Sequence, residues 1–148
     1  MAYAYASAPD VVGHLTLVAT FTATSRPNAS QVHNHLLDTA AELNSKLAEA
    51  DYSVPVSTAA SAAFEQLNHF NAIGAAMYTT AAHPAGKDSK HLEFLERRWN
   101  AILSGIADGS ISLDAEQDTS VSLPRFGRSD PLAAGASPYF TRDFSQGI

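Results

Sequence analysis

The feature that most constrains the fold is a long apolar stripe in the first third of the chain. Asn28 stands three residues before Gln31, which is a variant of the capping box that begins helices, and Pro55 prevents a helix from continuing beyond it. Between these signals, apolar residues recur at spacings of three and four, the pattern of one helix face: Val32, Leu36, Ala40, Leu43, Leu47 and Ala50. The sequence therefore predicts a helix over 29–50.

A second helix is predicted over 58–82, with Ser57 as its cap. Glu65 is its only charged residue, so more than one of its faces should be covered, and it is the candidate for the central packing element. Gly74, among several small residues, should let another helix approach closely. The apolar stripe of this helix consists of Ala60, Ala63, Phe64, Leu67, Phe70, Gly74, Met77, Tyr78 and Ala81.

A third helix is predicted over 89–107, where Asp88 or Ser89 supplies the cap and Gly109 lies just beyond the end. Its inner face is formed by Leu92, Leu95, Trp99, Ile102, Leu103 and Ile106, and its outer face by Glu93, Glu96, Arg97 and Arg98. Trp99 is interpreted as a core residue and not as a ligand platform.

The first 24 residues fit two patterns. Ser7 is a suitable cap for a short helix, whereas apolar residues alternate with threonines from Leu15 to Thr24, which is typical of a strand. We expect a short helix over 8–16 and an extended segment over 18–25.

The composition changes after Leu113. Prolines and glycines interrupt any helical stripe, although aromatic residues and arginines are spread along the remaining segment. We therefore expect an all-α protein, with a bundle of three long helices and a short N-terminal helix over 1–113 and an extended C-terminal arm over 114–148. Aromatic and arginine side chains are enriched at protein interfaces. The predicted partner-binding residues of the arm are Arg125, Phe126, Arg128, Tyr139, Phe140, Arg142 and Phe144.

Composition excludes several functions. The net charge of −6 disfavours a protein that reads duplex DNA, because such proteins carry a basic face. The absence of cysteine excludes disulfides, thiol nucleophiles and Cys-based zinc sites. No basic N-terminal region and no run of roughly 20 apolar residues is present, so neither a signal peptide nor a membrane segment is expected.

The six histidines form no metal-binding pattern. His33 and His35 point about 200° apart on a helix, and His83 and His91 have no carboxylates at ligand spacing. The motifs of zinc proteases, serine hydrolases and nucleotide-binding loops are also absent. We therefore expect no catalytic, cofactor-binding or metal site, and no enzymatic activity.

The charged residues of the helices are interpreted as solvated surface. Lys46 follows Glu42 by four residues, which favours an ion pair on the helix surface. Arg97 and Arg98 should likewise pair with the glutamates one turn earlier.

Taken in order, these segments resemble the head-to-tail adaptor proteins of tailed bacteriophages. The resemblance rests on FTATSRPNASQV before the first long helix, AELNSKLAEADYSVPV at its end, the Ala-rich second helix and a tail containing PYFTRDF. It covers roughly residues 20–148. The chain departs from the family at Asp51, where relatives often carry a glycine before the aromatic residue.

The resemblance implies a ring, usually of twelve copies, below the portal at one capsid vertex. The ring extends the DNA channel, docks the next neck or tail protein, and lets DNA pass without sequence-specific binding. The C-terminal segment reaches the portal or a neighbouring subunit. The protein would then belong to the virion neck and be assembled in the cytoplasm of the bacterial host, with no membrane partner.

A second hypothesis stays open from the residues alone. The chain could be a self-contained helical bundle that binds a ligand or regulates another protein, with its tail folded over its own core.

Overall fold

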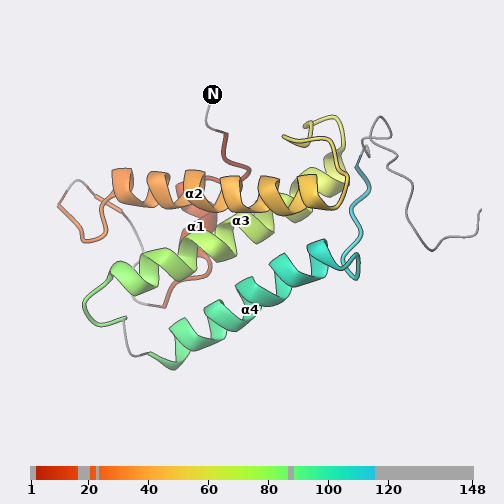
Figure 1. Cartoon of the computed structure of the whole chain (residues 1–148). Coiled ribbons are helices and arrows are strands. Elements are labelled where there is room, and N and C mark those ends of the chain that lie inside the picture. The colour runs from red at the N-terminus through yellow and green to blue at the C-terminus, as the bar shows by residue number, and fades with distance from the viewer. Residues whose placement is uncertain (1–2, 17–20, 23, 87–88, 116–148) are drawn as a thin grey trace, which may run out of the picture.

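The computed structural model describes residues 3–16, 21–22, 24–86 and 89–115 of the chain. Within these ranges the protein is helical and contains no β-strand, which confirms the predicted all-α class (Figure 1). The helices are α1 (Ala8–Val12), α2 (Ala29–Glu49), α3 (Ser61–Ala82) and α4 (Lys90–Ala107). No described helix is both long and apolar enough to cross a lipid bilayer.

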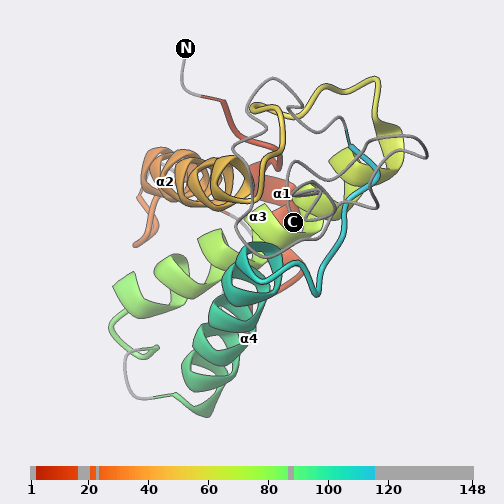
Figure 2. The ribbon, with the colours of Figure 1, turned by 45° about the vertical axis from the view of Figure 1, so that its right-hand side comes forward.

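Helix α3 is the centre of the bundle. It lies between α2 and α4, and α1 packs on α3 and α2 (Figures 1 and 2). Every residue of the run 71–76 is buried, because helices cover α3 on several sides. The expectation that this nearly uncharged helix is covered on more than one face is therefore confirmed.

A glycine in α3 lets the helices approach closely. A Cβ atom added at Gly74 would lie 2.8 Å from the Trp99 ring of α4 and 2.9 Å from the Thr39 methyl group of α2. Trp99 is 2% exposed, so its predicted place in the core is confirmed. The close packing of α2, α3 and α4 thus depends on the missing side chain at Gly74.

The helix ends follow their sequence signals. In α2, the Asn28 side chain accepts a hydrogen bond from the Gln31 N–H (2.9 Å), and the Gln31 side chain accepts one from the Asn28 N–H (2.9 Å). In α4, the Ser89 hydroxyl accepts from the Leu92 N–H (3.1 Å). These caps satisfy backbone donors that have no partner within the helix, and both helices begin within one residue of the predicted position.

The end of α2 places Asp51 in the left-handed backbone region, with a φ of 63°. Glycine is favoured at this position because it has no Cβ, and aspartate is among the few other residues that tolerate it. Asp51, where the adaptor proteins that the sequence resembles often carry glycine, therefore has a conformation that suits glycine, and the helix still ends at Glu49.

Two predicted boundaries are wrong. Helix α3 begins at Ser61 and not at 58, because the Ser57 hydroxyl accepts from the Ala59 N–H (3.2 Å) in a turn that precedes the helix. Helix α1 ends at Val12 and not at 16, because the chain then continues in turns, with the His14 N–H donating to the Val11 carbonyl (3.0 Å).

The extended segment predicted over 18–25 lies partly outside the described residues. In the described part, the Thr22 N–H donates to the Ser25 hydroxyl (3.0 Å), and the Ser25 N–H donates to the Thr22 hydroxyl (3.1 Å). These reciprocal bonds close a local turn, so this part is not extended.

Candidate functional surfaces

The predicted binding residues of the arm lie outside the described part of the chain, which ends at Ala115. These residues are Arg125, Phe126, Arg128, Tyr139, Phe140, Arg142 and Phe144. The base of the arm is described. Leu113 is 7% exposed, and its N–H donates to the hydroxyl of the buried Tyr52 (3.2 Å). The chain is therefore attached to the bundle up to the point where its composition changes.

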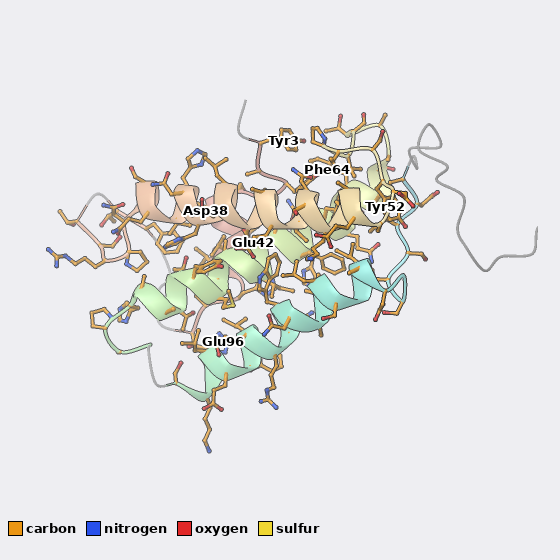
Figure 3. All side chains as sticks on the ribbon, in the orientation of Figure 1. Tyr3, Asp38, Glu42, Tyr52, Phe64 and Glu96 are labelled. Carbon is orange, nitrogen blue, oxygen red and sulfur yellow. The ribbon has the colours of Figure 1, made fainter. Side chains whose placement is uncertain are left out.

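An aromatic cluster lies at the same end of the bundle. The rings of Tyr3, Tyr5 and Phe64 meet edge to face, with centroids 5.3 Å apart for Tyr3–Tyr5, 5.7 Å for Tyr5–Phe64 and 6.4 Å for Tyr3–Phe64. Figure 3 shows Tyr3 and Phe64 together, with Tyr52 nearby. Tyr3 is 37% exposed and Val54, in the loop after α2, is 39% exposed. We call Tyr3, Tyr5, Tyr52, Val54 and Phe64 the aromatic end.

Tyr5 joins the aromatic end to the bundle. Its hydroxyl accepts from the Val56 N–H (3.1 Å) and is hydrogen-bonded to the Asn44 side chain of α2. Burial raises the pKa of this phenol, and the hydrogen bond from Val56 opposes the rise. Tyr5 therefore stays protonated and acts as a structural link.

A buried asparagine holds the N-terminal segment in place. The Asn71 side-chain oxygen accepts from the N–H groups of Tyr5 (3.0 Å) and Ala6 (2.9 Å). Its NH2 group donates to the Leu36 carbonyl (3.0 Å) and to the Thr39 hydroxyl (2.7 Å). All four hydrogen-bonding positions of this amide are used, so Asn71 connects the N-terminal segment, α2 and α3 at one point.

Glu42 of α2 links α3 and α4. Its carboxylate accepts from the Tyr78 hydroxyl (2.8 Å) and from the Trp99 indole N–H (3.1 Å). The hydrogen bond to Glu42, followed by burial, raises the pKa of Tyr78 to about 12. The predicted surface pair of Glu42 with Lys46 is wrong, because Glu42 turns toward the other two helices and Lys46 pairs with Glu49 (2.7 Å). The two hydrogen bonds to Glu42 stabilise helix packing, since both of its carboxylate oxygens already have donors.

Three histidines and an arginine meet on another face. The rings of His14 and His69 lie 5.1 Å apart edge to face, and the His91 Nε2 lies 2.8 Å from the His14 carbonyl oxygen. The Arg98 guanidinium lies 3.1 Å from the His69 Nε2. Burial lowers the pKa of His14, as do the nearby His69 and Arg98. We call His14, His69, His91 and Arg98 the histidine cluster.

The predicted ion pairs on the outer face of α4 are also wrong. Arg98 bonds to His69, and the Arg97 Nε donates to the backbone carbonyl of Glu93 (3.3 Å). Neither arginine pairs with a glutamate carboxylate within the described helix.

A histidine of α2 packs against α3. Half-buried His35 stacks on Tyr78 with ring centroids 5.9 Å apart, and burial lowers the pKa of His35.

The described residues include no group of three or more histidine, aspartate or glutamate side chains placed to hold a metal ion. The polar side chains of Tyr5, Asn71 and Glu42 instead connect one element to another. No known family, curated protein or solved structure matches this chain. The resemblance to phage adaptors thus remains a prediction made from the sequence.

Sequence reasoning missed the polar residues that connect the elements. For Asn71 and Thr39 a signal existed, because Asn71 follows Leu67 by four residues and Thr39 follows Leu36 by three, which places both on apolar stripes. A polar residue in such a stripe needs a buried hydrogen-bond partner. Glu42 had no comparable signal, since it stands beside the stripe at the position of an ordinary surface charge.

Proposed function

We propose that this protein is a structural component of a virion, a head-to-tail adaptor that forms a ring below the portal. The ring extends the DNA channel and docks the next neck or tail protein. In this proposal the helical body builds the ring, and the arm over 114–148 binds the portal or a neighbouring copy. No catalytic step is assigned to it.

The observation that carries this proposal is the attachment of Leu113 to Tyr52. The apolar core draws residues from Tyr5 to Leu113, and the Leu113 N–H bonds to a buried hydroxyl directly before the proline- and aromatic-containing arm begins. An adaptor needs a firm body and an arm that starts from a fixed point on it. The arm supplies aromatic and arginine anchors of the kind that dominate binding energy at protein interfaces.

The polar contacts of the body support a structural role. The side chains of Tyr5, Glu42 and Asn71 each bind groups on other elements of the same chain. A catalytic or ligand-binding site instead needs polar groups that converge on a substrate. In this chain such groups fix the positions of the helices, which suits a protein whose function is shape.

Contacts between copies are assigned to surfaces other than α3. The sequence suggested α3 as the central packing element, but its faces are used within the chain by α1, α2 and α4. The large apolar side chains left exposed in the described residues are Tyr3 and Val54 of the aromatic end and Phe94 of α4, which is 50% exposed. We place subunit or partner contacts at these residues.

The negative net charge of the chain is compatible with a channel through which DNA passes without binding tightly. Binding to DNA gains most of its free energy when lysines and arginines replace counterions on the phosphates. A chain of net charge −6 has little of this free energy to gain. We therefore expect a channel that DNA crosses without sequence-specific binding.

The test is binding of the full chain to the portal protein of the same virus. A triple variant, Phe126→Ala, Phe140→Ala and Phe144→Ala, should weaken binding about tenfold or more, because losing 1.4 kcal/mol already gives a factor of ten. A matched control changes three serines of the same arm, Ser129→Ala, Ser137→Ala and Ser145→Ala, and should bind within about twofold of the original chain.

The outcomes separate the two parts of the proposal. Equal binding by the phenylalanine and serine variants would remove the arm from the account. No binding of the original chain to the portal would refute the adaptor function itself.

A further inference from the structure

The histidine cluster lies where the chain beyond α1 crosses α3 and α4. His14 comes from that crossing segment, His69 from α3, and His91 and Arg98 from α4. The His14 carbonyl oxygen must accept the hydrogen bond from the His91 Nε2, so His91 carries a proton on that atom.

The contact between Arg98 and His69 has a different requirement. A guanidinium group only donates hydrogen bonds, so the His69 Nε2 at 3.1 Å must be an unprotonated acceptor. This arrangement therefore assigns the ring proton of His69 to Nδ1. A proton added at Nε2 would remove the bond and place two cations against each other.

Burial and most of the neighbouring groups disfavour a proton on His14, whereas Asp10 favours one. His69 faces it from α3, and His91 and Arg98 face it from α4. Asp10 of α1 is the one anion among these groups, and its carboxylate already accepts from the Ser7 N–H (2.8 Å) and the Ser7 hydroxyl (2.6 Å). Protonation of His14 thus adds a partly buried positive charge beside a permanent one.

We propose that the histidine cluster makes the docking of residues 8–16 on the helical bundle dependent on pH, so that acid releases this segment while the three long helices stay folded. The released segment remains tethered at its other end, where Tyr5 and Ala6 bind Asn71 through groups that do not titrate near neutral pH. The switch therefore opens one end of the N-terminal segment.

The direction of the pH effect follows from the pKa of His14, which is lowered in the docked segment by burial, His69 and Arg98. In the released segment His14 takes up a proton near its ordinary value of about 6.5. Docking is complete above that pH and weakens as the pH falls below it, because the released form binds more protons.

The test is hydrogen exchange of the full chain between pH 7.5 and 5.0, corrected for the intrinsic pH dependence of exchange. Protection of amides in 8–15 should fall, by at most about thirtyfold, because His14 in the released segment, with an ordinary pKa of about 6.5, is almost fully protonated at pH 5.0. Protection in the middle of α2 should not change. The double variant His14→Gln/His69→Gln should remove the dependence, and His33→Gln, on the exposed face of α2, should retain it.

Two results would overturn the proposal: an equal loss of protection in α2 and in 8–15, or a double variant that keeps the full pH dependence. A second measurement applies if the double variant does not fold. Arg98 is exposed, and Arg98→Gln should raise the titration midpoint of the His14 ring, measured by NMR. An unchanged midpoint in that variant would also overturn the proposal.

Discussion

The three-helix bundle and the N-terminal segment are held by different kinds of interaction. In α2, α3 and α4, apolar stripes pack against one another around Gly74 and Trp99. The segment over 3–16 also buries Tyr5 and Val11 in this core, but it depends in addition on hydrogen bonds to α3, including one from the Asn68 side chain to the Tyr5 carbonyl (3.0 Å). Apolar packing depends mainly on buried area, whereas a hydrogen bond needs particular atoms in particular places.

This difference predicts that substitutions in the bundle lower the stability of the whole molecule, while substitutions at the polar contacts act first on the segment.

The largest effect is expected for Leu43→Ala in the centre of α2. Leu43 is fully buried, and removing its side chain leaves a cavity, so the free energy of unfolding should fall by about 4 kcal/mol. Chemical denaturation measures this change. Leu37→Ala, at a half-buried position on the same helix, is the control and should cost about 1 kcal/mol. Equal losses for the two variants would show that the stripe is not the core of the bundle.

Asn71→Ala tests the polar side of the contrast. The variant leaves the N–H groups of Tyr5 and Ala6 without their acceptor, and should cost about 3 kcal/mol. Hydrogen exchange should show these two amides losing protection before the α2 amides do. Asn34→Ala, at an exposed site of α2, is the control. Uniform loss of protection across the chain would mean that the segment and the bundle unfold together.

Two glycines provide the next comparison. Gly74→Ala places a Cβ 2.8 Å from the Trp99 ring, and the forced movement should lower the free energy of unfolding by about 2 kcal/mol despite the better helix propensity of alanine. Gly13, beside α1, has a φ of −60° and its nearest contact for a Cβ is an ordinary 3.5 Å. Gly13→Ala should therefore be neutral or stabilising by about 0.5 kcal/mol. Thermal denaturation of both variants measures the difference, and a stabilising Gly74→Ala would contradict the packing described.

The smallest effect is a gain at Thr79 of α3. Its hydroxyl is buried and has no hydrogen-bond partner in the described structure. Thr79→Val keeps the shape and removes this polar group, so stability should rise by about 1 kcal/mol. Thr58→Val, at an exposed position before α3, is the control and should change stability little. A loss of stability in Thr79→Val would show that the hydroxyl has a partner.

The same contrast explains what could be predicted from the sequence. The apolar stripes and the caps at Asn28 and Ser89 are local signals, and they placed α2 and α4 correctly because every residue involved lies within a few positions. The start of α3 was missed because Ser57 can cap a turn as well as a helix.

Contacts between distant residues could not be predicted in this way. The histidine cluster joins residues as far apart as His14 and Arg98, and nothing near either residue in the sequence indicates the other. Glu42 likewise has the spacing of a surface charge, yet binds Tyr78 and Trp99, because its orientation depends on how three helices cross. The arm residues proposed as the binding site lie outside the described part of the chain, so their role remains a prediction.

Electron microscopy of the full chain mixed with purified portal rings tests the proposed assembly on a portal. We expect a second closed ring, built from copies of this chain and stacked on the portal, which is lost when residues 114–148 are deleted. Bare portal rings beside a monomeric chain whose tail resists proteolysis would refute the proposed assembly.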